Sequence, residues 1–266
     1  MRVFESTPRV DLPDLHVAVC GDWHGSVGWM RSVARALQRT APQVKTVLHV
    51  GDWWMDLNAS DSICRKAGID RIIVTLGNHE PWAAITPLLN AHPGKAIRVS
   101  EVTWVLPRPF RMTIGGREVL SVGGAASVDR EWRTEGRDWW PEELITDDDV
   151  ETAKRGGPAD VLLTHESPEP SPVAEVSRIL AENPLGLSAD ARAASTASRE
   201  RISAVWEATR PPLMFHGHMH TYGQGTQDDG RTVISLGADE QAGNVALLDL
   251  DNMTVEMPAL REIRGY

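Results

Sequence analysis

Short apolar runs alternate with stretches of helical periodicity over the first 90 residues. Three largely apolar runs are typical of buried strands and occupy residues 15–20, 44–50 and 71–76. Apolar side chains then recur at helical spacing over residues 27–39, and shorter helices are expected over residues 60–67 and 81–90. This alternation of strand and helix predicts a largely parallel sheet with helical cover.

The pattern changes after residue 96. Strand candidates separated by proline and Gly-Gly turns predict antiparallel hairpins over residues 97–100, 103–106, 110–114 and 118–122. Further strands are expected at residues 160–164, 213–216, 232–236, 245–250 and 254–257. A helix is expected to start near residues 146–149, and further helices are expected at 173–181 and at 189–209. We expect one domain over residues 1–266, an α/β protein with two sheets face to face and helices outside.

Residues 127–150 stand apart because they are rich in tryptophan, arginine and acidic residues. We interpret them as a functional loop or insertion. Trp139 and Trp140 are expected to anchor this insertion to the body of the protein.

Composition narrows the classes of function. The chain has 266 residues, with 27 basic and 37 acidic side chains and a net charge of −10, which argues against a surface that coats nucleic acid. A small anionic substrate is compatible with this charge, since bound divalent cations would reverse the local field. The chain lacks an apolar run of the about 20 residues that span a bilayer, and residues 1–15 lack the apolar segment of a signal peptide. Two cysteines fit a reducing compartment, so we expect a cytoplasmic protein without a membrane partner.

Side chains with metal-ligand chemistry follow the predicted strands. They are Asp22, His24, Asp52, Asn78, His165, His218 and His220. Loops at the carboxyl ends of strands direct side chains into one crevice, and mixed carboxylate, amide and imidazole donors suit Mn, Fe or Zn. Each motif by itself could be a turn or a helix cap. Their occurrence together, all at strand ends, predicts a two-metal site with Asp52 at its centre.

The motifs GDWHG at 21–25, GD at 51–52, GNHE at 77–80, His165 and GHMH at 217–220 together resemble the calcineurin-like metallophosphoesterases, including bacterial and phage-encoded members. The resemblance implies a four-layer αββα sandwich of two mixed β-sheets flanked by helices. It also implies two divalent transition-metal ions, with Mn expected first and Fe, Zn, Ni or Co as alternatives. It assigns the first metal to Asp22, His24 and His220. It assigns the second to Asn78, His165 and His218, with Asp52 bridging both.

The same resemblance implies a mechanism. A hydroxide that bridges the metals attacks phosphorus, and His79 protonates the leaving group.

The sequence departs from the family at residues 51–58, where GDWWMDLN replaces the GDxxDRG of many protein phosphatases. The missing arginine argues against a Ser/Thr protein phosphatase. Asp56 lies one residue later than the family's aspartate that supports the histidine of GNHE, so its support of His79 is open. Trp53 could stack on a base or an aromatic leaving group, or pack under the metal loop.

A replacement phosphate contact could come from the insertion. Arg130 is the first candidate because it is nearest the preceding strand, and Arg133 and Arg137 are the others. The alternative is that these arginines form surface salt bridges with neighbouring glutamates.

We therefore expect a dinuclear-metal hydrolase of small phosphodiesters, such as cyclic nucleotides, with no stable nucleic-acid partner. The alternatives are a phosphomonoesterase on small metabolites or nucleotides, a DNA-repair nuclease, and a scaffold without metals. The acidic balance disfavours the nuclease. All seven candidate ligands and His79 are present, so nothing in the sequence supports a scaffold without metals.

Overall fold

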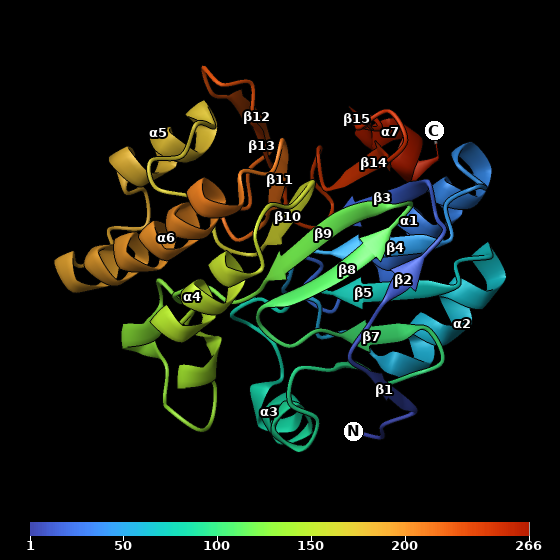
Figure 1. Ribbon diagram of the computed structural model, residues 1–266, viewed down its shortest axis with the longest axis horizontal. Helices are drawn as coiled ribbons and strands as arrows, with labels where there is room; N and C mark the ends of the chain where they lie inside the picture. Colours follow the sequence, from blue (N-terminus) through green and yellow to red (C-terminus); the bar gives the residue numbers. More distant parts are fainter. Residues whose placement is uncertain (266) are drawn as a thin grey trace.

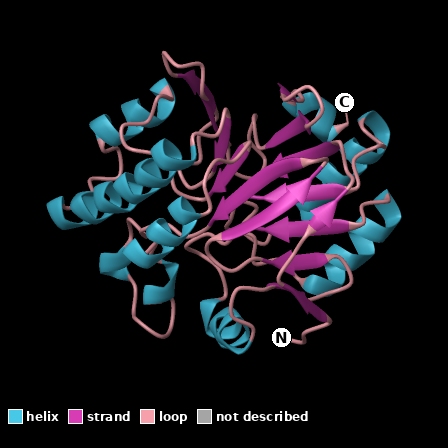
Figure 2. Ribbon diagram, in the orientation of Figure 1, coloured by secondary structure: helices cyan, strands magenta, loops and turns pink. Residues whose placement is uncertain are grey.

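Two β-sheets lie face to face at the centre of the computed structural model, which describes residues 1–265 (Figures 1 and 2). In spatial order, the first sheet contains β1 (Glu5–Thr7), β6 (Ala96–Arg98), β7 (Thr103–Val105), β5 (Arg71–Val74), β4 (Thr46–His49), β3 (His16–Cys20), β14 (Val245–Asp249) and β15 (Thr254–Glu256). The second contains β12 (Gly223–Thr226), β13 (Thr232–Ser235), β11 (Leu213–His216), β10 (Val161–Thr164), β9 (Arg117–Val122), β8 (Phe110–Ile114) and β2 (Asp11–Leu12).

Both sheets are mixed. In the first sheet β3, β4, β5 and β7 run parallel, and β14 is antiparallel to β3. In the second sheet β9, β10, β11 and β13 run parallel, and β8 and β12 are antiparallel to their neighbours β9 and β13. The parallel strands of each sheet therefore end at one edge, where their loops can meet.

The alternation of side chains along each strand builds the layers. On β3, Val17 and Val19 pack between the two sheets, whereas Ala18 and Cys20 pack against the helices outside the first sheet. Residues i and i+2 of a strand share a face, so a strand covered on both sides is apolar throughout.

Helices cover the outer face of each sheet and complete four layers. The first sheet is covered by α1 (Val27–Thr40), α2 (Leu57–Ala67), α3 (Trp82–Ala91) and α7 (Leu260–Arg264). The second is covered by α4 (Asp147–Arg155), α5 (Ala174–Glu182) and α6 (Ala189–Thr209), on the left of Figure 1. The insertion contains two 3-10 turns, η1 (Arg130–Trp132) and η2 (Pro141–Glu143). The expected fold of two mixed sheets flanked by helices is confirmed.

The expected elements that differ are short or lie at edges. The helix expected at residues 60–67 begins at Leu57, because the side chain of Asp56 accepts a hydrogen bond from the Ala59 amide and caps it. The strands β1, β2 and β12 and the helix α7 were not expected. The strand β12 has the sequence Gly-Gln-Gly-Thr, which has no apolar pattern. It joins the sheet through backbone pairing with β13. No helix within residues 1–265 is long and apolar enough to cross a bilayer.

Candidate metal centre

The loops after β3, β4, β5, β10 and β11 meet and bring the seven candidate ligands together. The loops of the first sheet supply Asp22, His24, Asp52 and Asn78, and those of the second supply His165, His218 and His220. Asp22, Asp52 and His165 are completely buried. The candidate centre thus lies where the two sheets face each other, at the carboxyl ends of their parallel strands.

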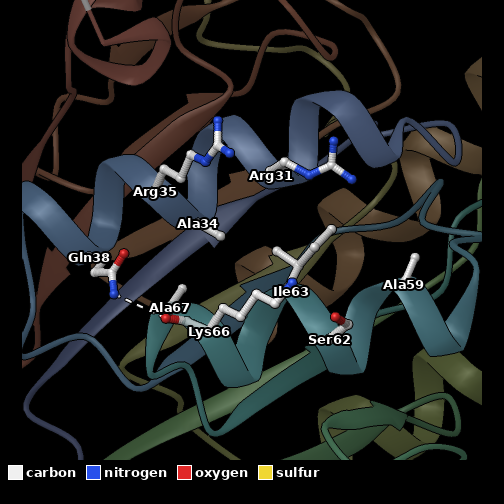
Figure 3. A pocket seen from close by; sticks show the side chains of 9 residues that line it. All are labelled: Arg31, Ala34, Arg35, Gln38, Ala59, Ser62, Ile63, Lys66 and Ala67. Atoms are coloured by element: carbon white, nitrogen blue, oxygen red, sulfur yellow. Dashed lines mark hydrogen bonds between the residues drawn. The ribbon is translucent and has the colours of Figure 1, made fainter.

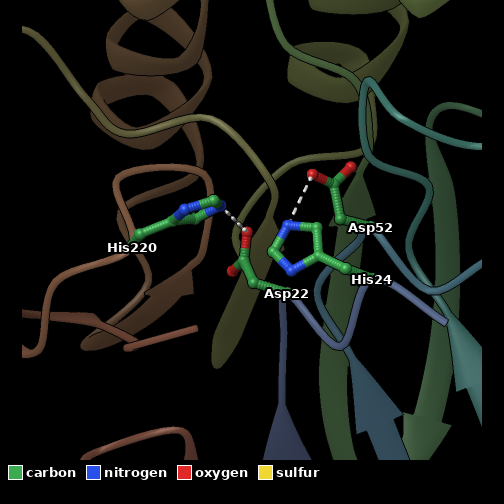
Figure 4. A group of neighbouring side chains, drawn as sticks. All are labelled: Asp22, His24, Asp52 and His220. Carbon is green, nitrogen blue, oxygen red and sulfur yellow. Dashed lines mark ion pairs between the residues drawn. The ribbon is translucent and has the colours of Figure 1, made fainter. Parts of the chain in front are cut away.

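One group of ligands surrounds the carboxylates of Asp22 and Asp52 (Figure 4). Donor atoms of Asp22, His24, Asp52 and His220 all lie within 4.8 Å of one another. Nε2 of His24 is 3.6 Å from Oδ2 of Asp52, and Nε2 of His220 is 3.3 Å from Oδ1 of Asp22. These four side chains could share one cation.

The other ligands gather on the opposite oxygen of Asp52. Nε2 of His165 lies 3.4 Å from Oδ1 of Asp52 and 2.9 Å from Oδ1 of Asn78. The rings of His165 and His218 are 5.0 Å apart between centroids. One carboxylate therefore faces both groups, through Oδ2 toward His24 and through Oδ1 toward His165.

The backbone at the centre is held in an uncommon conformation. Asp22, His24, Asp52, His218 and His220 have φ between 46° and 66°. Non-glycine residues adopt this left-handed region rarely and at a cost, so the surrounding structure must hold them there. Five of the seven candidate ligands share this conformation, which turns each loop sharply after its strand.

Two glycines of the motifs are required by close approach. A Cβ on Gly77 would collide with Oδ1 of Asp52, and a Cβ on Gly217 would collide with Oδ2 of Asp22. Only glycine lets these backbones lie against the carboxylates.

Unpartnered buried atoms indicate that the centre fits cations. Oδ2 of Asp52 and Nε2 of His218 are buried without a hydrogen-bond partner in the part of the chain that the structure describes. Burial would raise the pKa of Asp52, but the charge of His165 holds it well below its ordinary value. For His165 burial acts in the opposite direction and lowers the pKa. The negative charge of Asp52 outweighs burial and raises the pKa of His165 to about 10. A buried carboxylate among imidazoles suits a borderline divalent metal, so the residues present fit metal binding.

Three groups outside the ligand set orient the ligands, and the sequence did not reveal them. Oδ1 of Asp239 lies 3.1 Å from Nδ1 of His24. The carbonyl oxygen of Val50 lies 2.8 Å from Nδ1 of His165, and Asn78 donates to Oγ of Ser127 at 3.0 Å. His24 and His165 thus donate through Nδ1 and direct Nε2 inward, an arrangement that tunes metal ligands. In the sequence, Asp239 was marked only by its position shortly after a predicted strand.

Glu80 ties two of the metal loops together. Its buried carboxylate accepts from the amides of Gly77 and Trp53 through Oε1, both at 3.1 Å, and from the amide of Trp54 through Oε2 at 3.2 Å. The glutamate of the GNHE motif is therefore a clamp between the loops after β4 and β5, a role that the sequence pattern did not indicate.

Asn244 fixes the loop after β3 in a similar way. Its Oδ1 accepts from the indoles of Trp23 and Trp29, and its amide donates to the carbonyl oxygens of Gly21 and Gly237. Two of the ten tryptophans thus support the loop that carries Asp22 and His24.

The two tryptophans after Asp52 have opposite environments. Trp53 is 4% exposed and packs in the core outside the first sheet, which agrees with the expected alternative that it packs under the metal loop. Trp54 is 38% exposed, and its ring centroid lies 5.8 Å from that of His24 and 5.7 Å from that of His79. Trp54 is the aromatic side chain that borders the centre.

Asp56 and His79 are not brought together. The carboxylate of Asp56 caps α2, and no hydrogen bond joins it to His79 within residues 1–265. The one-residue offset places Asp56 at the start of the helix, where the Ala59 amide is its donor. Support for His79 comes instead from Arg133, whose Nη2 lies 3.1 Å from Nε2 of the imidazole.

Arg133, rather than Arg130, is the arginine at the candidate centre. The guanidinium of Arg130 lies over the ring of Trp139, 3.8 Å from its centroid. Arg137 is exposed and pairs with Asp138. Trp139 is buried and donates to Glu143, so this tryptophan anchors the insertion as expected.

A separate cavity of about 230 Å³ lies between α1 and α2, on the outer face of the first sheet (Figure 3). It is bordered by Arg31 and Arg35 from α1 and by Lys66 from α2. Its lining, taken from the described residues, contains neither histidine nor carboxylate, and it does not belong to the metal centre.

The family described as calcineurin-like phosphoesterase matches residues 15–222, which include all seven candidate ligands and His79. The chain belongs to the calcineurin-like phosphoesterase family. As a member of this family, it is a metal-dependent phosphoester hydrolase, and the resemblance inferred from the motifs is confirmed. No curated protein sequence matches the chain.

Solved structures share the fold at low identity. A protein of Thermus thermophilus is 13% identical, with a TM-score of 0.54, over 92% of this chain and 99% of that chain. A dimetal phosphatase from Danio rerio is 12% identical, with a TM-score of 0.57, over 93% of this chain and 97% of that chain. GAP50, described as the anchor in the inner membrane complex of Plasmodium, is 12% identical, with a TM-score of 0.50, over 93% of this chain and 85% of that chain. These similarities establish the fold, and the chemistry must be argued from the side chains.

Proposed function

We propose that this phosphoesterase uses two divalent metal ions and hydrolyses small phosphodiesters, such as cyclic nucleotides. One observation carries the proposal. The carboxylate of Asp52 faces His24 through one oxygen and His165 through the other, at 3.6 and 3.4 Å. A carboxylate between two sets of donors is the arrangement that a bridging ligand requires.

The proposed ligand sets follow from this geometry. Asp22, His24 and His220 would hold one ion, and Asn78, His165 and His218 the other, with Asp52 shared. Two such ions lower the pKa of water and offset negative charge on phosphate oxygens during in-line displacement. We propose Mn as the native metal, with Fe, Zn, Ni or Co as alternatives, since carboxylate and amide oxygens suit Mn and the imidazoles suit the others.

His79 is the proposed acid for the leaving group. Its backbone amide donates to Oδ1 of Asp52 at 2.9 Å, which fixes the residue directly on the proposed bridging carboxylate. His79 borders a cavity together with Asn78, Trp54 and Arg133, so it lies both beside a candidate ligand and on an open space. An acid at this point can protonate a leaving oxygen as the P–O bond breaks.

Three features support small diesters as the substrate class. The loop after Asp52 lacks the arginine of the protein phosphatases, and the exposed ring of Trp54 borders the centre. The net charge of −10 disfavours long nucleic acids, so we propose that the chain acts without a stable nucleic-acid partner.

We propose a cytoplasmic location for the protein. Cys20 and Cys64 are both free among the described residues, which supports this location.

A phosphomonoesterase is the second candidate, and Arg133 favours it. A monoester carries one more negative charge than a diester, and the guanidinium beside His79 would offset that charge. The same contact serves a diester less, so the ratio of the two activities distinguishes the candidates.

A substrate panel with Mn²⁺ present tests the proposal. Monoesters, linear diesters, and 2′,3′- and 3′,5′-cyclic nucleotides are compared by kcat/KM, and metal content is measured in the same preparation. We expect two ions per chain and the highest kcat/KM for a diester. Activity that survives complete chelation would contradict the metal mechanism, and a dominant monoester activity would select the second candidate.

Asp52→Asn and Asp56→Asn form a matched pair for the bridging role. The first removes a charge facing both ligand groups and should release both ions, whereas the second changes only the cap of α2. Loss of a single ion from the Asp52 variant would argue against a shared ligand.

A further inference from the structure

A cavity of about 370 Å³ opens beside His79, next to the cluster of metal ligands. Its lining includes Trp54, His79, Pro81, Arg133, Asp138 and Trp140. Trp54 follows β4, His79 and Pro81 follow β5, and the others come from the insertion. The insertion therefore closes one side of a space that the metal loops close on the other.

Trp54 forms an aromatic wall whose position is fixed. Its amide donates to Glu80, and its ring lies edge-on to both His24 and His79. The ring also rests against Gly25, where a Cβ would lie 2.6 Å from Cδ1 and Nε1 of the indole. The indole nevertheless remains 38% exposed, so apolar surface is kept open beside the ligands.

Trp140 contributes a second aromatic side chain from a different segment. It is partly buried and packs against the core outside the first sheet, so it too is held in place. Rigid aromatic rings bind planar groups at a low cost in conformational entropy. The cavity is also large enough for one aromatic ring system, at the lower end of ligand-pocket volumes.

We propose that this cavity is the leaving-group subsite and that it accepts a planar aromatic ring. The inference rests on the proposed function, because His79, whose amide donates to Asp52, lines the cavity together with the candidate ligand Asn78. If His79 protonates the leaving oxygen, the rest of the leaving group extends past His79 to Trp54 and Trp140. The ring can be attached to the oxygen directly, as in an aryl ester, or through a sugar, as in a nucleoside ester.

The test compares esters whose leaving groups differ in shape, and two of the three leaving groups are matched in acidity. One diester releases a phenol, a second releases a fluorinated aliphatic alcohol of matched pKa, and a third releases a nucleoside. Each is measured with the wild type, Trp54→Leu and Trp54→Phe. Trp132→Leu is the control, because Trp132 is in the insertion, is 69% exposed and does not line the cavity.

We expect Trp54→Leu to lower the preference for the aromatic over the aliphatic ester about tenfold, as expected for loss of one stacking contact. Trp54→Phe should keep most of this preference, and Trp132→Leu should leave it unchanged. A loss limited to the nucleoside ester would place the ring one sugar away from phosphorus, and a loss limited to the phenyl ester would place it next to phosphorus. Equal losses on aromatic and aliphatic esters would overturn the subsite.

Binding of the free alcohol separates this inference from the proposed function. Calorimetric titration with phenol and with adenosine requires no hydrolysis. Binding that weakens in Trp54→Leu and persists in Trp132→Leu supports the subsite even where no ester is hydrolysed. Undetectable or unchanged binding of both alcohols, together with normal hydrolysis, rejects the subsite and leaves the proposed function intact.

Discussion

The guanidinium of Arg133 lies 3.1 Å from Nε2 of His79, across 54 positions of the sequence. A guanidinium has only donors, so Nε2 accepts in this contact, and His79 can act as an acid at Nε2 only after a proton replaces the contact with Arg133. Nη2 of Arg133 also reaches Oδ2 of Asp129 at 2.6 Å, and Nη1 donates to the carbonyl oxygen of Asp138 at 2.9 Å. The insertion thus places one oriented cation beside the proposed acid.

Arg133→Ala should reduce kcat/KM about tenfold or more, because a charge-assisted hydrogen bond to phosphate is worth roughly 1.5–3 kcal/mol. Arg133→Lys should recover only part of the loss, since lysine lacks the planar fork. Steady-state kinetics on one diester and one monoester provide the measurement. Arg137→Ala is the control, because Arg137 is exposed and pairs with Asp138. If Arg130→Ala impaired turnover more than Arg133→Ala, the assignment would pass to Arg130.

Asp239→Asn should weaken metal binding about 10- to 100-fold while the fold persists. The carboxylate lies 3.1 Å from Nδ1 of His24 and orients the imidazole. Metal content after dialysis against graded chelator, with circular dichroism as a check on folding, measures the effect. Glu240→Gln changes the exposed neighbouring residue and should retain the metal of the wild type. Equal retention by the Asp239 variant would show that His24 needs no carboxylate partner.

Asp56→Ala should lower the free energy of unfolding by about 1 kcal/mol and leave kcat unchanged. The side chain caps α2 through the Ala59 amide, and loss of an N-cap has roughly this cost. Denaturant unfolding and turnover are measured on the same preparation. A marked fall in kcat with unchanged stability would restore the support of His79 that the sequence suggested.

Glu143→Gln should flatten the dependence of stability on pH between about 4.5 and 7. Burial raises the pKa of Glu143 to about 7 from an ordinary value of 4.5, although Ser127 and Trp139 donate to its Oε1. In this range the folded chain keeps a proton that the unfolded chain releases, so stability falls as pH rises. The variant should gain up to about 3 kcal/mol over the wild type above pH 7, at about 1.4 kcal/mol per pKa unit. Glu166, whose burial also raises its pKa to about 7, remains in both proteins.

Unfolding free energies measured at pH 4.5 and 8 give the comparison. The exposed neighbour Glu142 supplies the control, since Glu142→Gln should leave the pH dependence as it is. Parallel pH profiles for wild type and Glu143→Gln would mean that the carboxyl titrates normally.

The sequence by itself indicated most strands of the two sheets and the candidate ligands. A strand buried on both faces is apolar throughout, so its end is visible where polar residues begin, as at Asp22, Asp52 and Asn78. Parallel strands of one sheet end at one edge, and this rule together with the motif resemblance predicted that the donors meet. The short strands β1, β2 and β12 were not predicted, because they form through backbone pairing rather than a side-chain pattern.

Tertiary structure decided which side chains surround the ligands. Trp53 and Trp54 are adjacent and chemically alike, and Glu80 holds both of their amides, yet one indole lies in the core and the other at the centre. Arg130 and Arg133 differ in the same way, since η1 places one over Trp139 and the other at His79. Loops have no fixed period, so the direction of each side chain follows from contacts with distant segments. The sequence therefore indicated the candidate ligands, and tertiary packing determined which side chains lie next to them.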